Sequence, residues 1–297
     1  MDIKSKFLER FKKDYSLPIP LSNPKYFDYY LKTIDKHFQS IEKFNTFLEV
    51  YNENFLDDSM ILQNKIIKDI QNSDFYQFYL NWNIPSVNFN NLDILYRLEN
   101  ENCWFVKIDL VKANYQALKY VGKYNKDISL LKNTYEAFIQ QYTPYKYFQE
   151  SKKFRQVIFG SLNPKRQQKI QKLLMNQIYS IISENALLNN LVLAGPDELI
   201  FKINENFVPK IKQHLSLLYD TDIDLHIEPF QLKILKSKFS NFYICEYKNK
   251  VKFKHVPLTL FMQVYKKYIN EPLQEEDLLF FDGNFIAKYI EELIWIN

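Results

Sequence analysis

The stretch Trp104-Phe105-Val106-Lys107-Ile108-Asp109-Leu110 is a mostly apolar run that carries a single carboxylate near its end, and a short helical pattern follows over residues 113–120. An apolar run of this length is typical of a buried strand. A strand that turns at once into a helix brings its last side chains to the edge of a sheet. We therefore expect Asp109 at a sheet edge, where its carboxylate can meet a ligand.

A second acidic turn lies downstream, in Leu191-Val192-Leu193-Ala194-Gly195-Pro196-Asp197-Glu198-Leu199-Ile200-Phe201. Two short apolar segments flank the Gly-Pro-Asp-Glu corner, which predicts a hairpin whose tip presents Asp197 and Glu198. Two such acidic edges side by side would form a divalent-metal site, because carboxylate oxygens are ligands that these ions prefer. The plainer interpretation is that Asp109 caps the next helix and that the hairpin tip is merely polar.

The remaining periodicities predict an α+β protein. Helices are expected over residues 4–15, 26–39, 40–55, 57–71 with Asp57 or Asp58 as cap, 113–120, 128–141, 164–184, 207–219, 258–269 and 286–295. Strands are expected over residues 94–98, 103–110, 191–201 as a hairpin, 224–235, 242–247 and 251–255. From residue 103 onward the order is that of a β-α-β-β-α-β sheet, in which Asp109 and Asp197 are neighbours.

Three segments are expected: a helical N-terminal region over 1–93, a catalytic core over 94–255, and a small helical C-terminal cap over 256–297. The 297 residues are 46% hydrophobic, enough for a buried core, and the net charge of +4 is mild. No apolar run reaches the ~18 residues of a membrane helix, and the charged start is unlike a signal sequence. We expect a cytoplasmic protein without membrane contact. Phosphate-loop, dinucleotide and zinc motifs are missing from the sequence, which disfavours those classes.

One face of the predicted helix over 164–184 carries a row of cations. The residues on this face recur at spacings of 4, 3, 4 and 3, and they are Lys165, Lys169, Lys172, Asn176 and Tyr179. Such a row suits a nucleoside triphosphate, because ammonium groups bind phosphates and a tyrosine ring packs on sugar or base. The alternative is a solvated lysine face on an ordinary helix.

Three segments resemble motifs of nucleic-acid polymerases. Lys172 to Ser180 resembles the fingers-helix motif K-x-x-x-N-S-x-Y-G of family B DNA polymerases from phages and large DNA viruses, with Gln177 and Ser180 in place of the Ser and Gly. Lys107 to Tyr115 resembles motif A, with Asn114 at the usual tyrosine spacing. Leu193 to Phe201 resembles motif C, nearer the H-D-E-L-I-F form of family A, with Pro196 in place of the His. The motifs occur in the polymerase order A, B, C.

The resemblance implies a palm-like sheet with a helical fingers segment. It implies a template-dependent nucleotidyltransferase that extends a 3′-hydroxyl of DNA or RNA by two-metal-ion phosphoryl transfer. Its Mg²⁺ (or Mn²⁺) ligands would be Asp109, the carbonyl of Leu110 and Asp197, with Glu198 as an auxiliary catalytic acid. The nucleotide-binding residues it implies are Lys172, Lys169, Asn176, Tyr179, Tyr115 and Arg166.

Basic residues after the second acidic motif are the expected nucleic-acid contacts. Lys236, Lys238, Lys252 and Lys254 lie on and around the predicted hairpin, in a segment that faintly resembles the primer-gripping region of family B enzymes. Phosphate contacts there would be sequence-independent and salt-sensitive, although lysines on an edge strand also serve solubility. The implied partners are a primer-template, nucleoside triphosphates and accessory proteins.

Two other interpretations remain open. One is a palm-derived nucleic-acid-binding or scaffold subunit of a viral replication or transcription complex that has lost catalysis, which the departures at Pro196, Gln177 and Ser180 favour. The other is a protein-interaction domain that makes no contact with nucleic acid.

Overall fold

The structure is a computed structural model that describes residues 3–52, 54–87, 90–125, 131, 134–219, 221, 223–283 and 285–296. It divides into two compact units. Unit 1 joins residues 1–49 to residues 231–297, and unit 2 is residues 50–230. Each unit combines helices with antiparallel strands, so the expected α+β class is confirmed. The division groups the two ends of the chain, unlike the three consecutive segments expected.

Unit 2 contains most of the helices. Its helices are α4 (Phe55–Gln71), α5 (Asp74–Asn81), α6 (Ala113–Gly122), α7 (Tyr135–Gln140), α8 (Lys146–Glu150), α9 (Lys152–Gly160), α10 (Pro164–Glu184), α11 (Ile211–His214) and α12 (Ser216–Tyr219). Its strands are β1 (Leu92–Asp93), β2 (Trp104–Leu110), β3 (Leu191–Ala194), β4 (Glu198–Ile203) and the first part of β5 (Leu225–Ser237).

The sheet of unit 2 is ordered β1-β3-β4-β2-β5. β4 pairs antiparallel with both β3 and β2, so the predicted hairpin and the predicted first strand are neighbours. The middle of β2 is fully buried at Phe105, Val106 and Ile108, which explains its apolar sequence. β2 pairs with β4 along most of its length, and the backbone N–H of its last residue, Leu110, donates to the carbonyl of Asp197. The last residues of β2 therefore lie beside the β3–β4 turn.

The expected strand over 94–98 is wrong. β1 covers only two residues and pairs with β3, and a short 3₁₀ turn at Leu98–Asn100 follows it. The Asn100 side chain donates hydrogen bonds of 3.0 Å to the carbonyls of Ile94 and Leu95. These bonds satisfy backbone acceptors that a strand partner would otherwise use, so residues 94 and 95 do not extend β1.

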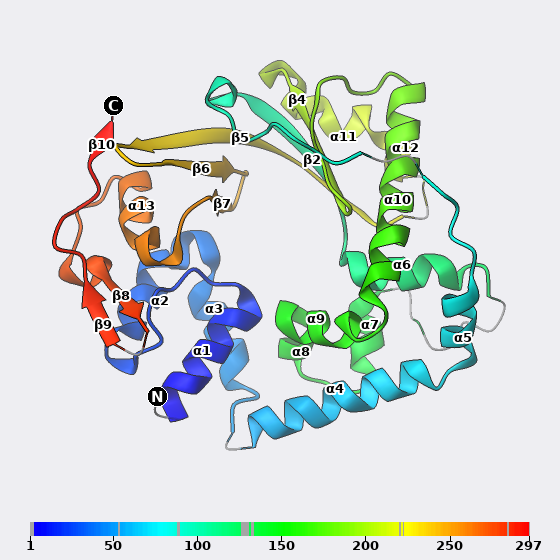
Figure 1. Cartoon of the computed structure of the whole chain (residues 1–297), viewed down its shortest axis with the longest axis horizontal. Helices are drawn as coiled ribbons and strands as arrows, with labels where there is room; N and C mark the ends of the chain where they lie inside the picture. The colour runs from blue at the N-terminus through cyan, green and yellow to red at the C-terminus, as the bar shows by residue number, and fades with distance from the viewer. Residues whose placement is uncertain are drawn as a thin grey trace. The chain divides into compact units, whose positions relative to one another are not determined.

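Helix α10 has the bounds expected from the sequence. The Asn163 side chain accepts a hydrogen bond from the backbone N–H of Arg166, and a proline occupies the first turn, so the start is well capped. Its apolar face buries Ile170, Leu174 and Ile178 completely. The helix packs on α6, the helix that follows β2, as Figure 1 shows. Helix α10 is therefore anchored next to the acidic strand.

Other helix predictions needed correction. The helix expected over 40–55 ends at Leu48, and α4 begins at Phe55, so Asp57 and Asp58 lie in its first turn rather than at its cap. The helix expected over 207–219 consists of short pieces, because Pro209 interrupts the backbone hydrogen bonding. Helix α7 covers the end of the segment 128–141, of which residues 128–130, 132 and 133 lie outside the described residues. Helices α5, α8 and α9 were not expected.

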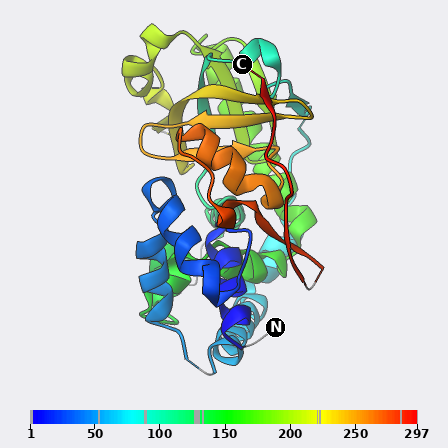
Figure 2. The same cartoon turned by 90° about the vertical axis from the view of Figure 1, so that its left-hand side faces the viewer.

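Unit 1 combines the N-terminal helices with the C-terminal strands. Its elements are α1 (Ile3–Tyr15), α2 (Pro24–Phe38), α3 (Ser40–Leu48), the end of β5, β6 (Asn241–Glu246), β7 (Val251–Lys254), α13 (Phe261–Tyr268), β8 (Leu279–Asp282), β9 (Phe285–Lys288) and β10 (Trp295–Ile296). The expected β6–β7 hairpin is present. The Phe253 ring on β7 lies 5.1 Å from that of Phe261 and 5.9 Å from that of Tyr265 on α13, which lies along the hairpin in Figure 2.

The helical cap expected over 286–295 is wrong. β9 forms a hairpin with β8, and β10 pairs with β5. Gly283 has a φ of +59°, a left-handed conformation that glycine adopts without strain, so it suits the turn between β8 and β9. Of the helices described, none is long and apolar enough to span a membrane.

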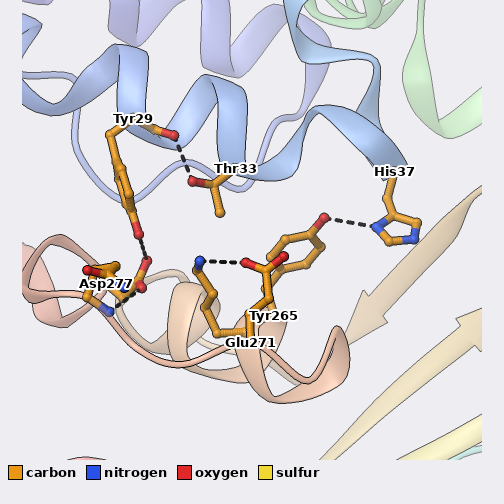
Figure 3. Close-up of polar contacts among 8 residues, drawn as sticks. Tyr29, Thr33, His37, Tyr265, Glu271 and Asp277 are labelled. Carbon is orange, nitrogen blue, oxygen red and sulfur yellow. Dashed lines mark hydrogen bonds and ion pairs between the residues drawn. The ribbon is translucent and has the colours of Figure 1, made fainter.

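Polar contacts tie α2 to the C-terminal part of unit 1 (Figure 3). The Tyr29 hydroxyl donates a 2.8 Å hydrogen bond to Asp277, which is 1% exposed and also accepts from the backbone N–H of Gln274 at 2.8 Å. His37 Nδ1 lies 2.9 Å from the Tyr265 hydroxyl. These bonds join segments from the two ends of the chain and stabilise unit 1 as one body.

Candidate functional site

The acidic residues singled out in the sequence meet at one end of β2 and β4. Asp109 and Glu198 are directly opposed in the antiparallel register, and the backbone N–H of Leu110 donates a 2.9 Å hydrogen bond to the carbonyl of Asp197. The side chains of directly opposed residues lie on the same face of the sheet. The sheet register therefore brings together the strand-end acid and the acids of the turn.

Lys107 lies between two of these carboxylates. Its Nζ is 3.1 Å from Asp109 Oδ2 and 2.6 Å from Glu198 Oε2, so both carboxylates point toward the position that the Lys107 ammonium occupies. Burial alone would lower the pKa of the Lys107 ammonium, but the Asp109 and Glu198 carboxylates outweigh it and raise that pKa. Lys107 was not among the predicted site residues. Its spacing of two from Asp109 in a strand is the signal that puts both side chains on one face.

Asp197 is a turn acid of the cluster, and its pKa is raised. Burial raises its pKa first, and the nearby Asp109 and Glu198 carboxylates raise it further, while Lys107 opposes them. Three acids and one ammonium leave excess negative charge, which a cation would relieve.

The donor set fits a divalent cation in its chemistry, because Mg²⁺ and Mn²⁺ prefer carboxylate and carbonyl oxygens. Among the described residues, no group of three His, Cys, Asp or Glu side chains is already arranged to hold a metal ion. An ion between Asp109 and Glu198 would take the place of the Lys107 ammonium. An ion bound on the side of Asp197 could be present together with the Lys107 ammonium.

The cation row of α10 lies beside a pocket of about 750 Å³. The lysines Lys165 and Lys169 are exposed and Lys172 is half-buried. The pocket is lined by these three lysines, Asn163, Arg166 and residues 81–87. Asn176 is half-buried and Tyr179 is 37% exposed, and neither lines the pocket. The structure thus groups the lysines with the segment after α5 rather than with the end of the motif.

Arg166 supports the pocket wall. Its Nε donates a 2.7 Å hydrogen bond to the carbonyl of Tyr79, its Nη2 donates to the carbonyl of Trp82, and its guanidinium lies 5.3 Å from the centre of the Tyr79 ring. These contacts hold the end of α5 against α10. Much of the donor capacity of Arg166 is therefore used within the protein, and its position is that of a wall residue.

Tyr115 is a core residue. It is 3% exposed, and its ring lies 5.8 Å from that of Tyr135 and 5.7 Å from those of Phe138 and Phe159. An aromatic cluster of this kind contributes packing energy and leaves the ring no open face for a sugar or base. We therefore give Tyr115 a structural role. Spacing along α6 indicated its helix face but not the helices packed against that face.

Two further cations lie near the end of β2. Lys112 has a φ of 50°, pairs with Glu136, and its Nζ lies 5.1 Å from the centre of the Tyr135 ring. The Arg155 guanidinium lies 5.5 Å from the centre of the same ring. Burial, together with the charge of Arg155, lowers the pKa of Lys112 to about 8. Lys112 and Arg155 therefore both lie near the Tyr135 ring, and neither was among the predicted site residues.

The basic residues expected to grip nucleic acid lie on strands of unit 1. Lys252 and Lys254 flank Phe253 on β7 and share one face, opposite Cys245 and Tyr243 of β6. The remaining members of the set are Lys236, near the end of β5, and Lys238, which follows it and is exposed. All four lysines belong to unit 1, so any basic surface they form lies within this unit.

Comparison of the sequence with models of known protein families gives no match, and comparison with curated proteins gives none.

Proposed function

We propose that the chain is a template-dependent nucleotidyltransferase that extends a 3′-hydroxyl, built on a palm-like sheet. The observation that carries the proposal is the convergence of Asp109, Asp197 and Glu198 at one end of β2 and β4. The strand order β3-β4-β2-β5 supports it, because the first strand of a β-α-β-β-α-β unit then lies beside the hairpin. The acidic edge and the lysine-rich helix are the two parts that phosphoryl transfer needs.

The chain supplies the ligands for its metal ions. Asp109, Asp197 and the carbonyl of Leu110 would hold Mg²⁺ or Mn²⁺, with Glu198 as the auxiliary acid. When bound, such ions stabilise the charge that develops on the attacking and leaving oxygens. Lys107 positions Asp109 and Glu198 by holding both carboxylates on one face of the sheet.

The other proposed contacts orient the substrates. Lys172 and Lys169 bind the triphosphate, and Asn176 and Tyr179, which follow them on the same face of α10, contact sugar and base. Lys236, Lys238, Lys252 and Lys254 bind primer-template phosphates without reading sequence. Accessory proteins would supply processivity, and a viral or phage replication complex in the host cytoplasm is the setting that the motif resemblance suggests.

The second candidate is a nucleic-acid-binding or scaffold subunit that lacks catalysis. The Lys107 ammonium favours it, because this group already satisfies Asp109 and Glu198 without a metal ion. In that case the acids would stabilise the sheet and the basic surfaces alone would be functional.

Incorporation of labelled nucleotide on a primed template separates the two candidates. The nucleotidyltransferase predicts Mg²⁺- or Mn²⁺-dependent incorporation that Asp109→Asn or Asp197→Asn lowers by about 100-fold or more. The exposed Asp58 on α4 provides the matched control, and Asp58→Asn should leave the rate unchanged. Equal incorporation by all four proteins, or none by the wild type, would favour the scaffold.

A further inference from the structure

The pocket beside the first half of α10 has the charge of a polyanion site. Four of its lining residues are cations, and of the described residues that line it none is acidic. Within the part of the chain that the structure describes, Lys165, Lys169 and Lys172 have no carboxylate partner. Unpaired ammonium groups around a concave surface attract phosphates.

We propose that this pocket binds a single-stranded segment of nucleic acid, which is the template overhang if the chain is a polymerase. Lys165, Lys169 and Lys172 follow one another along the helix, and at 1.5 Å per residue they span about 10 Å. A row of this length matches a chain of successive phosphates. A single point anion would engage only one or two of the three.

The opposite wall is suited to bases. It is formed by residues 81–87, Asn-Trp-Asn-Ile-Pro-Ser-Val, which combine two amide side chains with the aromatic Trp82 and the apolar Ile84, Pro85 and Val87. The Trp82 ring is stacked on that of Tyr124 at 5.4 Å, which fixes its orientation in the wall. A cationic groove with aromatic and apolar side chains opposite it is the usual arrangement for binding a single strand.

A metal-bound triphosphate held by Lys169 and Lys172 accounts for only one end of this pocket. It leaves Lys165 and residues 81–87 without a ligand, and the described lining has no carboxylate to hold a metal ion further along the pocket. Phosphodiesters need only cations and hydrogen-bond donors, which the lysines and the amides of Asn83 and Asn163 supply. Lys172 lies at the border with Asn176 and Tyr179, so a strand in the pocket would end beside the proposed nucleotide.

The test measures fluorescence anisotropy of a labelled single strand of mixed sequence. Lys165→Glu should weaken binding about fivefold or more, and Lys165→Ala should lower the slope of log K against log salt by about 0.7. Lys165 is exposed and is not among the proposed catalytic or triphosphate contacts, so the variant tests the pocket alone. Lys153→Glu, on the exposed face of α9, is the charge-matched control.

Three results would overturn the inference. Binding that Lys165→Glu leaves unchanged, or that Lys153→Glu weakens equally, would show that the strand does not use the pocket. Displacement of the strand by inorganic tripolyphosphate at matched ionic strength and phosphate concentration would assign the pocket to a small polyphosphate. Only the identification of the bound strand as a template rests on the proposed function. Asp109→Asn should lower incorporation by about 100-fold or more and leave strand binding intact, so the two proposals can fail separately.

Discussion

Replacing Lys107 by methionine tests how the acid cluster is held. Methionine keeps most of the volume and removes the ammonium, so Asp109 and Glu198 lose hydrogen bonds of 3.1 and 2.6 Å. Removing one partner of a buried ion pair costs about 3–5 kcal/mol. The Asp109 and Glu198 side chains are 28% and 29% exposed, so water compensates in part. We expect a loss of about 2 kcal/mol in the free energy of unfolding at pH 7.

Urea denaturation of both proteins at several pH values measures this loss. Because the folded protein raises the pKa of Lys107 above its usual value of 10.5, the stability it contributes is fully present below that pH. It is lost as the pH rises through the folded value. The difference between wild type and Lys107→Met should therefore be constant from neutral pH to about pH 9 and shrink above about pH 10.5.

The exposed Lys153 gives the control, since Lys153→Met should change stability by less than about 0.5 kcal/mol. A Lys107→Met protein as stable as this control would refute the ion-pair account. A difference that grew above pH 10.5 would refute the sign of the pKa shift.

Three further variants test other contacts. Asp197→Asn should raise the free energy of unfolding at pH 7 by about 1 kcal/mol. The folded protein raises the pKa of Asp197, so the stability that the protonated carboxyl contributes is lost as the pH rises through the folded value. The gain from the variant should therefore vanish near pH 3, and an equal gain at both pH values would contradict this reasoning. Arg166→Ala should cost about 2 kcal/mol in urea denaturation, because two backbone carbonyls lose their donor; an unchanged midpoint would show that the wall is held otherwise. Tyr29→Phe should cost about 1–2 kcal/mol by leaving Asp277 with one donor fewer, and no change in thermal stability would argue against that bond.

The elements that sequence patterns predicted well are those determined by local chemistry. Helix α10 has a capping asparagine, a first-turn proline and a continuous apolar face, so its bounds follow from its own residues. The β3–β4 hairpin is likewise determined by its Gly-Pro-Asp-Glu corner. The expectation that Asp109 lies beside the turn of Asp197 followed from the order of elements, because few topologies suit that order.

Contacts between distant segments were harder to predict. Lys107 interacts with Glu198 across strands, and Arg166 contacts the end of α5, which sequence spacing does not indicate. Tyr115 was assigned to a nucleotide because its neighbours on α7 and α9 were unknown. The segment 286–295 was expected to be helical, since a short apolar pattern suits either a helix or a strand until its partner is known.

Binding of Mn²⁺, followed by the electron paramagnetic resonance signal of the free ion, tests the central claim most directly. The claim is that Asp109, Asp197 and Glu198 share one cation site. We predict saturable binding by the wild type that Asp109→Asn or Asp197→Asn weakens by about tenfold or more, while Asp58→Asn binds as the wild type does. Equal affinity in all four proteins, or no binding by the wild type, would contradict the proposed site.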